Sequence, residues 1–306
     1  MKNAINYYYN LPVDEVHFSA QQYYFKIENQ LYILMTYYRP FDEIDAIVAL
    51  DFEIIKYNSN FHQIILNKDR QAITIIENIP YVLLKINVPI DRPITSEDLV
   101  KMPVTLSKQL SLLDRSNWVQ LWSNKLDYFE EQMGHMELEF PLLRENVIYF
   151  IGLGENAISY IRNTFLEERP SWEDRITICH RRISIKDTTF TFYNPLNLVL
   201  DYPVRDVSEY LKSLFWFDQY KIEEIEPWLR TNPLSNFEAR LLFGRLLFPS
   251  FFFDQYEKII DHQIEEKRIL EITTRTDEYE QFLMMIYRIL KEDHSLPEIE
   301  WLNKKM

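Results

Sequence analysis

The stretch ITICHRRISIKDTTFTFYNPLNLVLDYPVRDVSEY, residues 176–210, decides the fold of this chain. An apolar run that ends at His180 predicts a short buried strand. Residues 189–193 alternate threonine with aromatic side chains, which predicts a second strand. Helical spacing then begins at Arg205. The segment therefore predicts a β-hairpin that is followed by a helix.

This layout resembles the catalytic centre of aminoglycoside and choline kinases. Those enzymes carry H-G-D-x-H-P-x-N after a strand, I-D-W/F after a hairpin, and D-P-x-x-D before a helix. By position, His180 falls on the motif histidine, Arg182 on the catalytic Asp, and Asp187 on the metal-binding Asn. Asn194 falls on the Asp that would hold Mg²⁺. Asp206 falls on the final Asp, where it would cap or anchor the helix.

The residues at these vestigial positions cannot perform the kinase chemistry. The guanidinium of Arg182 cannot accept a proton from a substrate hydroxyl, and Asn194 is a neutral, weaker ligand for a hard cation. The predicted third strand, residues 31–38, lacks the phosphate-binding lysine. Lys26 and Arg39 lie nearby, but we expect both to be exposed surface charges. We therefore predict a pseudokinase with no catalytic residue, no metal and no cofactor.

A divergent ATP-dependent phosphotransferase, acting on a small molecule or a protein, is the alternative hypothesis. It would use displaced carboxylates, and Asp187 and Asp201 are the nearby candidates for a base or a Mg²⁺ ligand. No glycine occurs before Gly134, so residues 19–21 would form a phosphate-covering loop with ordinary backbone freedom. Small-molecule kinases often lack a strict glycine-rich loop, so the alternative stays open.

The kinase resemblance implies an α+β, two-lobed protein-kinase-like fold of the aminoglycoside phosphotransferase type. We predict a β-rich N-terminal lobe with one helix over residues 1–88, a proline-containing hinge over 89–103, and an α-helical C-terminal lobe over 104–306. Period-two patterning predicts six strands in the first lobe. They are Glu15–Phe18, Tyr23–Glu28, Leu31–Tyr38, His62–Leu66, Ala72–Glu77 and Tyr81–Ile86, with a helix at Asp42–Ser59.

Most of the chain also resembles the YutH family of spore coat proteins, which are related to the kinase-like CotS proteins. The resemblance lies in Cys179–Arg182, Leu200–Tyr210, and Gly244–Pro249 followed by Tyr256. It implies a catalytically inactive structural or interaction protein of the bacterial endospore coat. Such a protein would be made in the mother-cell cytoplasm, deposited on the spore coat, and bound there to other spore coat proteins.

Composition excludes several other classes of function. The net charge of −14 opposes binding to nucleic acid. The single cysteine, Cys179, excludes an internal disulfide, and we expect it to be a buried core thiol in an intracellularly made protein. The six histidines show no metal-binding spacing, and no apolar run is long enough to predict a membrane span.

Aromatic residues are abundant, at 15% of the chain. We expect most of them to lie in the core. Tyr7–Tyr9 and Phe251–Phe253 are the densest clusters, and either could provide a contact surface for a partner. The tyrosines lie near a chain end, where burial is less certain, so they are the better candidate. The oligomeric state does not follow from the sequence.

Overall fold

The computed structural model describes residues 1–99, 110–135, 139–171 and 174–303, and the chain forms two compact units. The first unit contains Met1–Asp114 and Ile178–Leu200, and the second contains Arg115–Thr177 and Asp201–Met306. The segment that decides the fold is therefore shared between them. Part of the predicted hinge, residues 100–103, and the predicted start of the C-terminal lobe at 104 lie outside the described residues.

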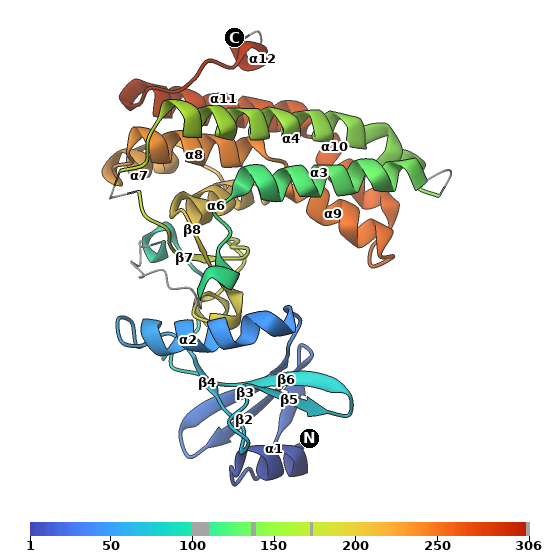
Figure 1. Ribbon diagram of the computed structural model, residues 1–306, viewed down its shortest axis with the longest axis vertical. Helices are drawn as coiled ribbons and strands as arrows, with labels where there is room; N and C mark the ends of the chain where they lie inside the picture. The colour runs from blue at the N-terminus through green and yellow to red at the C-terminus, as the bar shows by residue number, and fades with distance from the viewer. Residues whose placement is uncertain (100–109, 136–138, 172–173, 304–306) are drawn as a thin grey trace. The chain divides into compact units, whose positions relative to one another are not determined.

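An antiparallel sheet forms the centre of the first unit (Figure 1). Its strand order is β1-β2-β3-β6-β4, and β5 also pairs with β6. All six strands overlap the predicted ones. Their bounds are β1 His17–Ser19, β2 Gln22–Ile27, β3 Gln30–Thr36, β4 Gln63–Ile65, β5 Ile73–Ile76 and β6 Ile79–Lys85.

Both faces of this sheet are buried, because a helix covers each one (Figure 1). Leu34 and its cross-strand partner Leu83 point to the face where α1, Lys2–Tyr9, packs. Ile33 pairs with Leu84 in β6 and, by the alternation of strand side chains, points to the opposite face. Helix α2, Ile44–Ile54, lies on that side and contacts β4.

Helix α1 was not expected from the sequence, and it changes the interpretation of the N-terminal tyrosines. Tyr9 is buried, and its hydroxyl hydrogen-bonds to Thr74 at 2.9 Å. Tyr7 is 63% exposed, and the ammonium of Lys68 lies 3.2 Å from the centre of its ring. The helix thus buries part of the cluster that we proposed as a contact surface.

The hairpin prediction was half right. Strand β7, Thr177–His180, pairs with β8, Leu198–Asp201, and not with residues 189–193. Thr189–Phe192 forms the single-turn helix α5 instead. Four alternating residues are too few to distinguish a strand from a helical turn, and β8 lacks alternation because all four of its residues are buried.

The second unit is helical, as predicted for the C-terminal lobe (Figure 1). Helix α4 packs against α3 and α8, and α8 also contacts α6 and α11. The bounds are α3 Trp118–His135, α4 Pro141–Glu167, α6 Val204–Trp216, α7 Ile222–Thr231, α8 Asn236–Leu247, α9 Ser250–Ile260, α10 Leu270–Thr273, α11 Thr276–Asp293 and α12 Glu300–Asn303.

Aromatic side chains fill the core of the second unit. Phe252 and Phe253 are fully buried in α9, and Phe252 stacks on Phe150 with ring centres 3.9 Å apart. The phenylalanine cluster is therefore core and not a contact surface. No helix in the described part of the chain is long and apolar enough to cross a membrane.

Candidate functional site

His180, at the position of the kinase motif histidine, is a core residue. It is the last residue of β7 and is 2% exposed. One ring nitrogen lies 2.9 Å from the carbonyl oxygen of Phe192, and the imidazole packs on the Phe192 ring. His180 therefore fastens β7 to α5. Cys179 beside it is a buried free thiol, as expected.

Arg182 is the second residue after this strand, at the position of the catalytic base. Its side chain is exposed, and its Nη1 donates to the carbonyl oxygen of Arg181. A guanidinium carries only donors, so this position can bind an anion or an acceptor but cannot deprotonate a hydroxyl.

Asp187, at the position of a metal-binding Asn, closes a turn. Its Oδ2 accepts a 2.7 Å hydrogen bond from the Ser184 backbone N–H, and its own N–H donates to the Ser184 carbonyl. Its carbonyl accepts from the N–H of Ile94. Partial burial raises the pKa of the carboxyl above its ordinary value, against the opposing effects of the Ser184 bond and His180. The carboxylate thus has a structural role in holding the loop.

Asn194, at the position of the Mg²⁺-binding Asp, uses both halves of its amide within the first unit. Its Oδ1 accepts from the N–H of Leu196 at 2.9 Å and so caps the turn that precedes β8. Its Nδ2 donates to the sulfur of Met35 in β3 at 3.4 Å. The side chain is 5% exposed. The third strand carries no lysine, and Met35 contacts the amide instead.

Arg39 corrects an expectation, because it is a buried charge and not a surface one. Its Nε donates to Glu43 at 2.7 Å, and its Nη1 donates to the carbonyls of Leu196 and Leu198 at 3.0 and 2.7 Å. Burial lowers the pKa of the guanidinium, and Glu43 opposes that shift. Arg39 thus ties the start of α2 to the entry of β8. Lys26 is exposed, as predicted.

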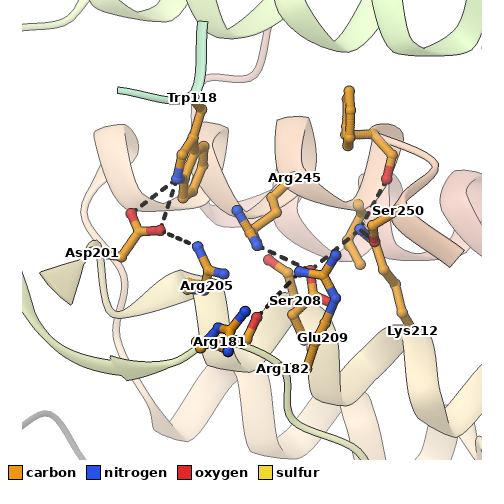
Figure 2. A network of polar contacts seen from close by, with 12 residues as sticks. Trp118, Arg181, Arg182, Asp201, Arg205, Ser208, Glu209, Lys212, Arg245 and Ser250 are labelled. Carbon is orange, nitrogen blue, oxygen red and sulfur yellow. Dashed lines mark hydrogen bonds and ion pairs between the residues drawn. The ribbon is translucent and has the colours of Figure 1, made fainter. Parts of the chain in front are cut away.

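Asp201 lies in the second unit at the centre of a buried polar network (Figure 2). Both of its oxygens accept from the Trp118 indole N–H, at 2.9 and 3.0 Å, and Oδ2 also accepts from Arg205 at 2.6 Å. Complete burial raises the pKa of this carboxyl, while Arg205 and Arg245 oppose the rise.

The network continues along α6 (Figure 2). Glu209 pairs with Arg245 at 3.2 Å and with Lys212 at 3.7 Å. Lys212 also donates to the carbonyl of Phe248 and to the Ser250 hydroxyl. The Arg245 guanidinium lies over the Trp118 ring at 4.9 Å. Sequence reasoning missed this cluster, although the spacing of Asp201 to Arg205 and of Glu209 to Lys212 is that of helical ion pairs.

Asp206 stands in the first turn of α6, where a negative charge favours the helix N-terminus. The N-cap residue is Pro203, which makes no side-chain cap hydrogen bond. Asp206 is 8% exposed. Its role in anchoring the helix stays a prediction.

Two buried titratable groups of the first unit were also missed. Asp51 of α2 accepts from the N–H of Ile64 at 2.9 Å, but its other oxygen has no hydrogen-bond partner within the described residues. Burial raises its pKa to about 7. His62 lies 2.9 Å from the carbonyl of Phe190, and burial lowers its pKa to about 4. In the sequence, only the apolar neighbours of Asp51 and His62 indicate that these two side chains are buried.

No metal site is evident from the side chains. Within the described ranges, no three His, Cys, Asp or Glu residues are grouped closely enough to hold an ion. Asp187 and Asp201, the two candidates of the alternative hypothesis, are both bound to protein groups. The arrangement supports anchoring of loops and helices rather than proton transfer.

Comparison with protein families gives a match over nearly the whole chain. The model of the family described as "Spore coat putative kinase YutH" matches residues 2–286. The endospore coat-associated protein YutH of Bacillus subtilis is 29% identical over 209 residues. That match spans 61% of this chain and 61% of the Bacillus subtilis protein, so it leaves over a third of each outside the alignment.

The fold is similar to that of small-molecule kinases, which confirms the predicted α+β kinase-like class. An aminoglycoside phosphotransferase from Alicyclobacillus acidocaldarius is 11% identical, with a TM-score of 0.55 over 95% of this chain and 97% of the other. A spectinomycin phosphotransferase bound to ADP and spectinomycin gives 0.54 at 11% identity over 95% and 92%. A choline kinase from Streptococcus pneumoniae gives 0.51 at 13% over 92% and 96%. At such identities the likeness concerns the fold alone.

Proposed function

Because the chain belongs to the YutH family of spore coat proteins, we propose that it is a kinase-fold component of the endospore coat that acts by binding and not by phosphate transfer. It would be made in the mother cell and assembled onto the spore with other coat proteins. The family match and the relation to the coat-associated Bacillus subtilis protein support the location. The residues at the former catalytic positions support the absence of catalysis.

The contact between Asn194 and Met35 carries the proposal. In kinases, the metal-binding residue and the strand lysine both need space for the nucleotide phosphates and their Mg²⁺ between them. Here the corresponding side chain and the third strand touch through the 3.4 Å hydrogen bond. Arg182 adds a positive charge where a base would be needed. The side chains at these three positions therefore support a role without phosphate transfer.

A divergent phosphotransferase is supported less well. Asp201 is 0% exposed and is bound to Trp118 and Arg205, so a substrate could reach it only after the second unit opened. Asp187 is more accessible, but its Oδ2 holds the turn at Ser184. Its raised pKa would suit a general base, which is the one observation that favours this alternative.

Calorimetric titration with ATP and with ADP, each with and without Mg²⁺, tests the proposal. We expect no heat of binding and no rise in melting temperature. Metal-dependent binding together with phosphate transfer to any acceptor would overturn it. Asp187→Asn would then show whether that carboxylate takes part, with Asp206→Asn as the matched variant at another vestigial position.

Location is tested separately in a sporulating host. A fluorescent fusion expressed from the native promoter should be made in the mother cell and then form a shell around the forespore. A fusion that stays diffuse in the mother cell throughout sporulation would contradict the coat assignment, whatever the nucleotide titrations show.

A further inference from the structure

An open groove runs along α4 in the second unit, where α4, α11 and α12 meet (all labelled in the upper part of Figure 1). It has two adjoining hollows, which share the side chains of Asn156 and Trp301. The apolar hollow has a volume of about 420 Å³ and includes Ile148 and Leu153. The polar hollow has a volume of about 370 Å³ and includes Ser159. We call the two together the α4 groove.

Gly152, in the middle of α4, lines the apolar hollow and has no role in the packing of the chain. A Cβ at this position would meet no atom within 4 Å. By contrast, a Cβ at Gly154 would lie 3.0 Å from Leu126, so close packing of α3 on α4 explains that glycine. Glycine inside a helix is less stable than alanine. At Gly152 this cost keeps the hollow open and allows a ligand to reach the helix backbone.

Two buried hydrogen-bond donors belong to side chains of the groove. The indole N–H of Trp301 and the hydroxyl of Tyr160 are buried and have no hydrogen-bond partner within the described residues. An indole N–H can only donate, and a buried donor without an acceptor destabilises the fold. Burial raises the pKa of Tyr160, so its phenol also stays protonated. Carbonyl oxygens of a ligand would satisfy such donors.

The charge of the groove is acidic. Glu280, Glu298 and Glu300 line it, and none of its described lining residues is Lys, Arg or His. Glu298 pairs with Lys291 outside the lining at 3.7 Å, so Glu300 is the main acidic group for a basic residue of a ligand. At the rim, Ile148 is 69% exposed, and Tyr149 is partly exposed with its hydroxyl bonded to Glu280. Ile148 and Tyr149 thus extend the apolar lining of the hollow to the surface of the protein.

We propose that the α4 groove binds an extended peptide segment of a partner protein, with an apolar side chain in the hollow at Gly152 and a lysine or arginine beside Glu300. An extended segment presents free backbone carbonyls for buried donors, and its side chains can enter two successive hollows. A basic residue complements the acidic lining and the net charge of −14. Both hollows are open to solvent along one side, which suits a peptide better than an enclosed small molecule.

The choice of a protein as the partner rests on the proposed function, in which this chain acts by binding other coat proteins. The groove lies within the second unit and shares no residue with the former catalytic positions, so the two can fail separately. Phosphate transfer by the wild-type protein would overturn the proposed function. The groove would still be tested by its own variants.

Selection from a random peptide library displayed on phage, against the full-length protein, provides the probe. The enriched sequences are expected to combine apolar residues with lysine or arginine. A synthetic peptide of the consensus sequence is then titrated against the wild type and Gly152→Leu, in which the new side chain fills the apolar hollow. We expect affinity to fall about tenfold or more. Trp301→Phe, which removes the N–H, should weaken binding by a smaller factor.

Gly134→Leu is the matched control. Gly134 is also a helical glycine, in α3, whose Cβ would meet nothing within 4 Å, but it does not line the groove. The control variant should bind the peptide like the wild type, and both leucine variants should melt no lower than the wild type. No enriched peptide, enrichment of acidic peptides, or equal binding by Gly152→Leu and the wild type would each overturn the proposal.

Discussion

The side-chain amide of Asn194 donates a hydrogen bond to the sulfur of Met35, across 159 positions of the sequence. This contact joins the turn before β8 to the third strand of the sheet in the first unit. The same amide caps that turn through the N–H of Leu196. Asn194, which aligns with a metal-binding position of the kinase motif, thus holds two parts of the first unit together. Substitutions at this position can therefore test the proposal that the site is inactive.

An aspartate at position 194 should destabilise the protein and should not create a binding site for Mg²⁺ or nucleotide. Asn194→Asp keeps an acceptor for Leu196 but replaces the donor to Met35 with a buried negative charge. We expect a loss of roughly 1–3 kcal/mol in the free energy of unfolding, because an unpaired buried group is costly. Chemical denaturation measures the loss, and titration with ATP and Mg²⁺ should show no binding.

Asn197→Asp is the control for that substitution. Asn197 is partly exposed. Its side-chain amide donates a hydrogen bond to the carbonyl oxygen of Thr191. Because Thr191 lies in α5 and Asn197 is partly exposed, Asn197→Asp should lower the free energy of unfolding less than Asn194→Asp does. If Asn194→Asp instead binds Mg²⁺ and nucleotide without loss of stability, the position is a dormant metal site and our interpretation of it is wrong.

Arg39 should be among the most sensitive charged residues of the first unit. Arg39→Met removes the donor to two carbonyls and breaks the buried ion pair with Glu43. Breaking one side of a buried ion pair costs about 3–5 kcal/mol. Arg92→Met is the control, since Arg92 pairs with Asp98 at the surface. Equal losses from the two substitutions in denaturation experiments would contradict the structural role of Arg39.

The raised pKa of the Asp51 carboxyl predicts an unusual pH dependence of the free energy of unfolding. Its pKa is about 7 in the folded protein against an ordinary value of 3.8. Between these values the folded state keeps the proton that the unfolded state releases, so the free energy of unfolding falls as pH rises. A shift of this size corresponds to on the order of 4 kcal/mol.

Asp51→Asn should remove this dependence while keeping an acceptor for Ile64. The variant should therefore gain stability relative to the wild type as pH increases from about 4 to about 8, measured by denaturation across that range. Asp45→Asn, at the start of the same helix, should leave the profile unchanged. A constant difference between Asp51→Asn and the wild type at every pH would show that Asp51 titrates at its ordinary value.

Trp118 should stabilise the second unit through its N–H as well as its ring. Trp118→Phe leaves the fully buried Asp201 with one hydrogen-bond donor fewer around it. We expect a loss of about 2–4 kcal/mol from the bond and the smaller ring together. Trp122→Phe makes the same change in size one helical turn later. Thermal unfolding should show the larger loss for Trp118→Phe, and the opposite order would contradict the importance of the indole bond.

The two helical glycines Gly244 and Gly152 should respond in opposite ways to alanine. A Cβ at Gly244 would lie 2.4 Å from Cδ1 of Ile161 and 3.0 Å from the ring of Tyr160. We expect Gly244→Ala to lose about 1–3 kcal/mol by overpacking, and Gly152→Ala to gain about 0.5–1 kcal/mol. A rise in melting temperature for both variants would show that α8 packs less tightly on α4 at Gly244 than these distances indicate.

Much of the fold could be predicted from the sequence, because its strands and long helices carry clear hydrophobic periodicity. Helix α1 could not, since it has no side-chain cap and three consecutive tyrosines favour a strand locally. It forms because Ile5 and Tyr9 are buried against the sheet. Residues 189–193 were misassigned for a similar reason, since contacts with distant residues and not local patterning decide their conformation.

The candidate site divides in the same way. The motif layout located His180, Arg182 and Asn194, because their spacing from the strand and helix is local information. It did not predict the burial of Arg39, whose partners Leu196 and Leu198 lie more than a hundred residues away. A long basic side chain is usually exposed, so only the tertiary contacts distinguish this one.

The buried thiol of Cys179 makes the two units separately observable by spectroscopy. Cys179 lies in the first unit, while all six tryptophans of the chain lie within the ranges of the second. A thiol-reactive dye therefore labels the protein at the rate at which the surroundings of β7 open, and tryptophan emission follows the helical unit over the same minutes. One sample thus shows whether the two units lose their structure in a single cooperative event or one after the other.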